Sequence, residues 1–295
     1  MTVAVCYLSA EGIVFGADST STWNIPGSPH YFNHGQKLFE IGEKSTLGLV
    51  TWGLGALNTG SHRALTATLA DDLKANPPAS VLQVSERWVD HFWTAYTTSM
   101  VVEIQRCKDL AAKPPYGQGT QQDRTEDEER EFRFLSDSLG VGFCIGGYLP
   151  SVRNPEAFAM LFHPLTDKPV PTPLPRHDAC VWGVPNIAKR LILGADERLV
   201  PDVMNSGHWS GTEADLWAIL NKYTLRHPPL PMRDAIDFVH MCIFSTIKAL
   251  KFSPYSQTCG GPIEIAVITA DRHFRWVMHK SWDSAITDGD HHGQG

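Results

Sequence analysis

The 295-residue chain lacks an apolar run long enough to cross a bilayer. One prominent uncharged apolar stretch, Leu47–Leu57, contains three glycines and a threonine and is far shorter than the roughly 20 residues that a membrane-spanning helix needs. No Lys or Arg precedes Lys37, so the basic start of a secretory signal is missing as well. We therefore expect a cytoplasmic protein without a membrane partner.

Positive charge is also scarce. Lys and Arg total 25 against 32 Asp and Glu, which gives a net charge of −7, and no dense basic cluster could neutralise a row of phosphates. Nucleic acid is therefore not expected as a partner. The six cysteines lie at least 17 residues apart and form no C-x-x-C pair. We expect buried free thiols, no metal and no other cofactor.

Several common catalytic motifs are missing. The sequence contains no G-x-x-x-x-G-K-[ST], H-E-x-x-H or G-x-S-x-G, which argues against P-loop, zincin and α/β-hydrolase chemistry. The segment Gly53-Leu-Gly55-Ala-Leu-Asn58 follows the dinucleotide-binding pattern until its sixth position, where Asn58 replaces the third glycine. Nucleotide binding is therefore not predicted.

The residues that are present indicate a well-packed globular protein, with 42% hydrophobic and 19% charged residues. Two N-terminal hairpins are predicted, Val3–Leu8 with Gly12–Ala17 and Lys37–Ile41 with Thr46–Thr51. Apolar residues at helical spacing then predict two amphipathic helices, one over Ser61–Lys74 and one capped by Ser80.

The second half of the chain returns to sheet. Strands are predicted at Gly140–Tyr148, Ala157–His163, Ala179–Val184, Ile263–Thr269 and Phe274–Met278, and helices at Asn186–Leu193, after Thr212 and after Pro231. Region 113–138 is rich in Pro, Gly and acidic residues, which predicts an exposed insertion with one charged helical turn. Because hairpins join the strands, we expect an α+β fold of two stacked antiparallel sheets flanked by helices.

Thr2 is a candidate nucleophile. Removal of Met1, as expected before a small side chain, would leave the threonine hydroxyl beside a free α-amine. An α-amine has a reference pKa near about 7.7 to 8.0, so it can accept the hydroxyl proton and later return it to a leaving group. One threonine would thus supply both nucleophile and base.

Two charged residues are predicted to lie near Thr2. In the first hairpin, residues whose numbers sum to about 20 or 21 face one another, which places Asp18 across from the start of the chain. Lys37 alternates with Phe39 and Ile41 and so has apolar neighbours rather than water. A lysine in such surroundings needs a carboxylate partner, which Asp18 can provide.

In the segments around Thr2, Asp18 and Lys37, the sequence resembles the proteasome β-subunits and their bacterial relatives among the N-terminal nucleophile (Ntn) hydrolases. The similar blocks follow in the same order: Thr2-Val-Ala-Val, Gly16-Ala-Asp18-Ser, Lys37-Leu-Phe-Glu-Ile and Trp52-Gly53-Leu-Gly55. The Lys37 block is a few residues late, which implies a small insertion around Trp23–His34. Cys144-Ile-Gly-Gly-Tyr148 and the run from Cys259 to Ile268 resemble later strands of that family.

The resemblance implies a four-layer αββα sandwich and hydrolysis of amide or peptide bonds. It implies one domain over 1–295 with insertions near 113–138 and 196–231 and a polar tail at 283–295. It gives Thr2 the roles of nucleophile and general base, Lys37 that of lowering the proton affinity of the amine, and Asp18 that of pairing with Lys37. The N–H of Gly53 would form the oxyanion hole. Substrate binding would fall to Thr22, Thr51 and Gly55.

The sequence also departs from the family pattern. Where the family has an Asp and a Ser that support the nucleophile, this chain has Ser256 and Cys259, and the position of a further supporting serine falls near Gly183. Supporting residues hold the geometry of catalytic groups, so we expect these departures to affect the rate and the type of the reaction.

Two alternatives to hydrolysis follow from these departures. A related enzyme could pass the acyl group to an amine instead of water, or the chain could be a silent assembly or binding subunit. The expected partners are a peptide or protein substrate and further copies of the chain in a homo-oligomer, while an unfoldase partner is left open.

Overall fold

The computed structural model describes residues 2–25, 28–254 and 258–280, and within them two five-stranded antiparallel sheets form the centre of the molecule. The first sheet has the order β12-β1-β2-β13-β14, with strands Asp178–Gly183, Val3–Leu8, Gly12–Ala17, Glu264–Thr269 and Arg272–Met278. The second has the order β11-β10-β9-β6-β5, with strands Thr172–Pro173, Glu156–Phe162, Val141–Gly147, Leu47–Gly53 and Leu38–Glu40. Both predicted N-terminal hairpins are confirmed, as β1–β2 and β5–β6.

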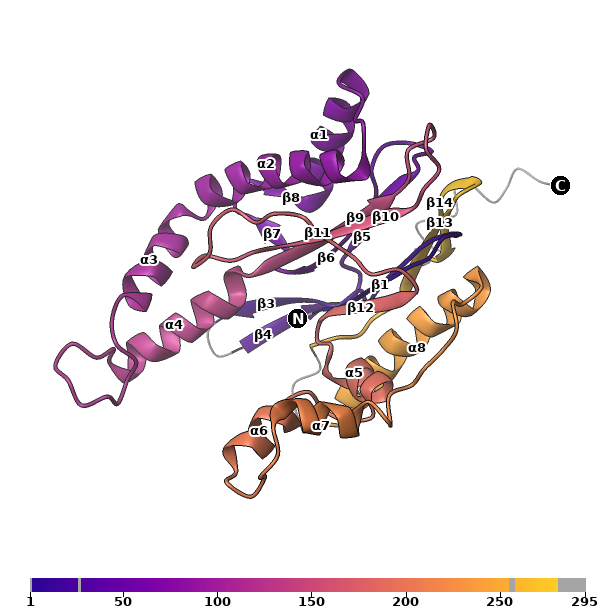
Figure 1. Cartoon of the computed structure of the whole chain (residues 1–295). Coiled ribbons are helices and arrows are strands. Elements are labelled where there is room, and N and C mark those ends of the chain that lie inside the picture. The colour runs from indigo at the N-terminus through magenta and orange to yellow at the C-terminus, as the bar shows by residue number, and fades with distance from the viewer. Residues whose placement is uncertain (1, 26–27, 255–257, 281–295) are drawn as a thin grey trace.

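Helices cover the outer face of each sheet, as Figure 1 shows. The second sheet is covered by α1 (His62–Ala75) and α2 (Val81–Ser99), which are followed by the pair α3 (Val101–Ala111) and α4 (Glu126–Leu139). The first sheet is covered from the other side by α5 (Asn186–Leu193) and α8 (Met232–Lys251), with α6 (Leu199–Asn205) and α7 (Glu213–Leu220) between them in the chain. The expected four-layer αββα sandwich is confirmed.

Three apolar clusters correspond to the three interfaces between these layers. One contains Trp88, Phe92 and Phe143 and lies between α1–α2 and the second sheet. A second, which includes Phe15 and Trp52, fills the space between the sheets. The third joins α5 and α8 to the first sheet. Each sheet is therefore buried on both faces, which explains why β1 and β2 read as continuous apolar runs rather than as an alternation.

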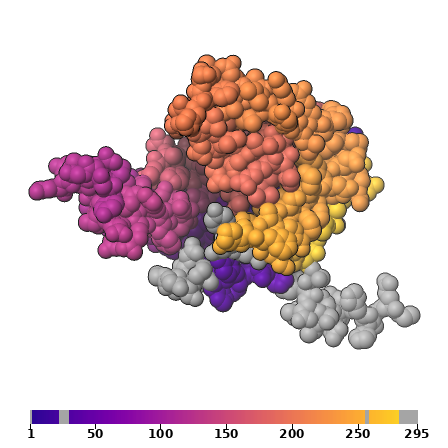
Figure 2. All heavy atoms as spheres, turned by 90° about the horizontal axis from the view of Figure 1, so that it is seen from below, coloured from indigo at the N-terminus to yellow at the C-terminus, as the bar shows by residue number. Residues whose placement is uncertain are grey.

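Region 113–138 is where the sequence prediction of a single charged helical turn was wrong. Helix α4 has 14 residues and begins with a full capping box between Thr125 and Glu128. Arg124, only 5% exposed, donates to the carbonyl of Leu110 at the end of α3 and lies over the Phe132 ring at 4.2 Å. The salt bridge Arg106–Glu131 joins α3 to α4, and the two helices form a hairpin that projects from the body (Figure 2).

The remaining differences concern short elements. The small insertion predicted around Trp23–His34 holds a hairpin of β3 (Ser21–Ile25) and β4 (Ser28–Phe32), and a second small hairpin pairs β7 (Ala56–Leu57) with β8 (Gly60–Ser61). Region 196–231 carries α6 and α7, and Thr212 caps α7 as predicted. The predicted tail 283–295 lies outside the described residues. No helix among the described residues is long and apolar enough to cross a membrane.

Truncation of Phe143 tests the contact between α2 and the second sheet. Phe143 is fully buried and contacts Trp88 and Phe92 at ring-centroid distances of 4.9 and 4.6 Å. Phe143→Ala should lower the free energy of unfolding by about 3–5 kcal/mol, because it removes buried apolar area and leaves a cavity. Urea unfolding measures the change, with Phe252→Ala as a control because Phe252 is 81% exposed. Equal effects of the two variants would contradict this packing.

Candidate active site

Asp18 lies directly after β2 and is held by hydrogen bonds from several segments of the chain. The register of the first hairpin pairs Ala4 with Ala17, so the predicted sum of 21 is confirmed. Oδ1 of Asp18 accepts a hydrogen bond from the Val3 N–H at 3.0 Å. Oδ2 accepts from the N–H groups of Thr20 at 3.2 Å and Gly260 at 3.0 Å. The carboxylate is fully buried, so these donors replace the water that it loses.

Lys37 completes the coordination of this carboxylate. It precedes β5 in the second sheet, is 5% exposed, and places Nζ 2.7 Å from Oδ1 of Asp18. Nζ also donates to the carbonyl oxygen of Thr20 at 2.6 Å. An ammonium group has three protons to donate. Two of them are accounted for by these acceptors.

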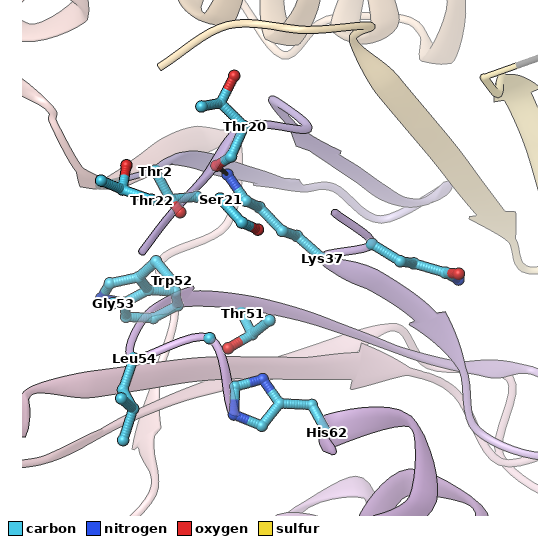
Figure 3. Close-up of a pocket in the computed structure, with 12 residues that line it drawn as sticks. Thr2, Thr20, Ser21, Thr22, Lys37, Thr51, Trp52, Gly53, Leu54 and His62 are labelled. Atoms are coloured by element: carbon cyan, nitrogen blue, oxygen red, sulfur yellow. Dashed lines mark hydrogen bonds between the residues drawn. The ribbon is translucent and has the colours of Figure 1, made fainter. Parts of the chain in front are cut away.

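A small cavity next to Lys37 brings the predicted residues together (Figure 3). Its volume is about 70 Å³. Six of the residues that line it were predicted from the sequence: Thr2, Thr22, Lys37, Thr51, Gly53 and Gly55. Six others were not: Thr20, Ser21, Gln36, Trp52, Leu54 and His62. Asp18 does not line the cavity itself, and it is connected to the cavity by its ion pair with Lys37.

Thr2 is held at the edge of the cavity by its own backbone. It is 4% exposed, and its carbonyl oxygen accepts a hydrogen bond from Val184 N at 2.8 Å. Gly183 has a φ of +79°, and a Cβ at this position would lie 1.8 Å from the Thr2 carbonyl oxygen. The serine that the resemblance implies near Gly183 would therefore collide with Thr2. Glycine at this position is a condition for the observed path of the Thr2 backbone.

Gly53 ends β6 with a backbone that suits no other residue. Its φ is +87°, and a Cβ would lie 2.2 Å from the carbonyl oxygen of Gly140. The N–H of Thr51, two residues earlier, donates to the Lys37 carbonyl, whereas the N–H of Leu54 donates to Gly140 on the opposite side. Because N–H groups alternate along a strand, the Gly53 N–H points to the same side as that of Thr51. That side faces Lys37 and the cavity.

The three predicted substrate-binding residues line the cavity in different ways. The Thr51 hydroxyl donates to the Gly142 carbonyl at 3.1 Å, so its proton is already used. The Thr22 hydroxyl oxygen is buried and has no hydrogen-bond partner among the described residues. Nothing lies within 4 Å of the place where a Cβ on Gly55 would be, so this part of the wall is open.

Of the two predicted supporting residues, the structure describes only Cys259. Ser256 lies outside the described residues. Cys259 is buried, and burial raises the pKa of its thiol to about 12, so it does not ionise near neutral pH. The segment that contains it nevertheless contributes through its backbone, because Gly260 donates to Asp18 and accepts from Ser19 N at 3.0 Å.

His62 is the most unusual residue that the sequence analysis missed. It opens α1 just after the capping residue Ser61, and it is 3% exposed between the rings of Phe92 and Phe143. Its Nε2 has no hydrogen-bond partner among the described residues. Burial lowers the pKa of the imidazole to about 4, so the ring is neutral at neutral pH. No local pattern marks it, because only the folded chain places the start of α1 against α2 and β9.

Solved structures of similar fold are found. Anbu (ancestral beta-subunit) from Yersinia bercovieri aligns with a TM-score of 0.50 and 11% identity over 95% of this chain and 88% of that one. An Anbu (Gly-1) mutant from Hyphomicrobium sp. strain MC1 aligns with a TM-score of 0.48 and 11% identity over 98% of this chain and 94% of that one. No protein-family model and no curated protein matches the chain.

These findings correct the family assignment made from the sequence. The fold is the proteasome-like Ntn fold, as the first alignment supports. The prediction that the chain is a member of the proteasome β-subunit-like hydrolases is wrong as a sequence assignment, because no model of any family recognises it and the structural neighbours share only 11% of its residues. Four short blocks in the right order are compatible with a shared fold and do not define a family.

The buried ion pair can be tested through stability. Asp18→Asn replaces one oxygen by an NH₂ group that faces hydrogen-bond donors, and it leaves Lys37 buried without a counter-charge. We expect a loss of about 3–5 kcal/mol in the free energy of unfolding, measured with urea. Asp127→Asn is the matched control, because its salt bridge with Arg130 is exposed and screened by water. An equally small effect at both positions would refute the importance of the buried pair.

The pKa of His62 predicts a pH-dependent contribution to stability. Its folded value of about 4 lies below the unfolded value of about 6.5, so the unfolded chain binds a proton first as pH falls. Between pH 6.5 and pH 4 this residue should therefore destabilise the fold progressively, by about 3 kcal/mol in total. Urea unfolding of the wild type and His62→Leu at pH 7 and pH 4 measures this. A difference between the two proteins that stays constant with pH would contradict it.

Proposed function

We propose that this chain hydrolyses amide or peptide bonds with Thr2 as an N-terminal nucleophile, after removal of the residue before it. The observation that carries the proposal is the buried Lys37–Asp18 pair, which comes from both sheets and meets Thr2 at one cavity. A buried lysine whose charge is balanced by a carboxylate, and that lines the same cavity as Thr2, suits activation of that threonine. The proteasome-like fold is consistent with this role.

The first step forms an ester. The Thr2 hydroxyl oxygen attacks the substrate carbonyl carbon while the free α-amine of Thr2 takes the hydroxyl proton. The positive charge of Lys37 lowers the proton affinity of that amine, so it remains a neutral base. The C–N bond of the substrate then breaks, and the amine of Thr2 returns the proton to the departing nitrogen. The acyl group is left on the threonine oxygen.

The second step releases the acid. A water molecule attacks the ester carbonyl, and the α-amine again accepts a proton, now from water. The C–O bond to Thr2 breaks, and the proton passes to the threonine oxygen, which restores the enzyme. In both steps the negative charge that develops on the carbonyl oxygen needs a donor, and we assign the Gly53 N–H to this role. Its direction toward the cavity supports the assignment.

Substrate binding is assigned to the other walls of the same cavity. Thr22 is in the edge hairpin β3–β4, where an extended peptide can pair with backbone groups. Thr51 and Gly55 are assigned to the side-chain pocket. We also propose that the chain forms a homo-oligomer, since the Yersinia neighbour is named a beta-subunit. Light scattering of the purified protein tests it, and a monomer would remove this part of the proposal.

The nucleophile is tested by intact mass before and after treatment with an epoxyketone or β-lactone, electrophiles that react with N-terminal threonine. We expect the native protein to begin at Thr2 and to gain one adduct. Thr2→Ala should abolish the adduct, and Lys37→Ala should reduce labelling by at least about a hundredfold, as for loss of an activating group. Thr68→Ala, on the exposed face of α1, should label like the wild type.

Two results of this experiment would contradict the proposal. A native protein that keeps a residue before Thr2 and gains no adduct would leave an assembly or binding role for this fold. Labelling that persists in Thr2→Ala would move the nucleophile elsewhere. Circular dichroism of each variant establishes that it is folded.

A further inference from the structure

Two polar atoms in the walls of the cavity have no partner in the described part of the folded chain. His62 Nε2 and the Thr22 hydroxyl oxygen are both buried without a hydrogen-bond partner among the described residues, and both residues line the cavity. Burying an unpaired polar group costs about 1–3 kcal/mol, so such groups call for a partner. Figure 3 shows the His62 ring below Thr51, on the side of the cavity away from Thr20.

The charges of the residues that line the cavity limit what the partner can be. The imidazole is neutral at neutral pH, so its unpaired Nε2 either donates or accepts a hydrogen bond, according to the tautomer, and offers no charge for a carboxylate. Lys37 is already paired with Asp18. Among the described residues no Asp or Glu lines the cavity, so a cationic group would find no counter-charge there. An uncharged group that can both donate and accept a hydrogen bond therefore fits best.

The size of the cavity limits the partner further. At about 70 Å³ it has less than half the volume of an apolar cavity of about 150 Å³ that holds benzene. An aromatic ring is therefore too large. A short side chain that ends in a hydroxyl or a carboxamide has the right size and the right hydrogen-bonding groups.

We propose that this cavity receives the side chain of the substrate residue whose carbonyl Thr2 attacks, and that His62 selects a short uncharged side chain with a hydroxyl or carboxamide. The proposal deepens the function given above and rests on it. His62 is a specificity residue here, since it contacts the substrate side chain and takes no part in the proton transfers. Serine, threonine and asparagine are the side chains that meet these conditions.

The experiment compares fluorogenic peptide amides that differ only in the residue before the scissile bond. Two pairs of nearly equal shape isolate the hydrogen bond: threonine against valine, and asparagine against leucine. We expect kcat/KM to favour the polar member of each pair by at least about tenfold in the wild type, because the apolar member leaves His62 unpaired. Aspartate and lysine substrates should be cleaved less well than asparagine. A preference for valine and leucine would overturn the proposal.

His62→Leu shows whether the imidazole is responsible. In this variant we expect the threonine-to-valine ratio to fall to about one or to invert. His208→Leu, an exposed histidine, is the control and should keep the wild-type ratio. An unchanged ratio in a folded, active His62→Leu protein would refute the role of His62.

The outcomes separate this proposal from the proposed function. If the wild type cleaves none of the peptides and Thr2 is not labelled, the hydrolase function fails, and the pocket proposal fails with it. If the wild type cleaves them without the polar preference, only the pocket proposal fails. If His62→Leu does not fold, the wild-type ratios of the two matched pairs still decide the question.

Discussion

The buried ion pair between Lys37 and Asp18 is the interaction on which the candidate site depends. It joins the two sheets at the point where they meet Thr2, and both charges are almost removed from water. Such a pair is stable only if every remaining hydrogen-bonding position is filled. Val3, Thr20 and Gly260 fill them with backbone N–H groups, so the positions of four chain segments are fixed by one carboxylate.

Glycines set the rest of the geometry. Gly53 and Gly183 both have positive φ, and in each case a side chain would strike a neighbouring carbonyl oxygen. One directs a strand end past the cavity, and the other lets β12 approach the carbonyl of Thr2. The site therefore relies on close backbone contacts.

Much of the fold could be predicted from local patterns, and the site only in part. Hairpin register placed Asp18 near Thr2, because side chains in paired strands meet at fixed offsets. Helix α4 was missed because its stability comes from contacts of Arg124 with α3, which an acidic run does not reveal. His62 was missed for a similar reason, since its neighbours Phe92 and Phe143 are distant in sequence. The family assignment failed because short blocks carry little statistical weight.

The hydrogen bond from Gly260 to Asp18 spans 242 positions of the chain. On the ribosome, residues are made in order, so Thr2, Asp18 and Lys37 emerge long before the segment that completes the carboxylate. Until that segment arrives, Asp18 lacks one of its donors and β2 lacks its neighbour β13. The arrangement thus delays completion of the hydrogen bonds to the buried carboxylate until the segment around Gly260 has been made.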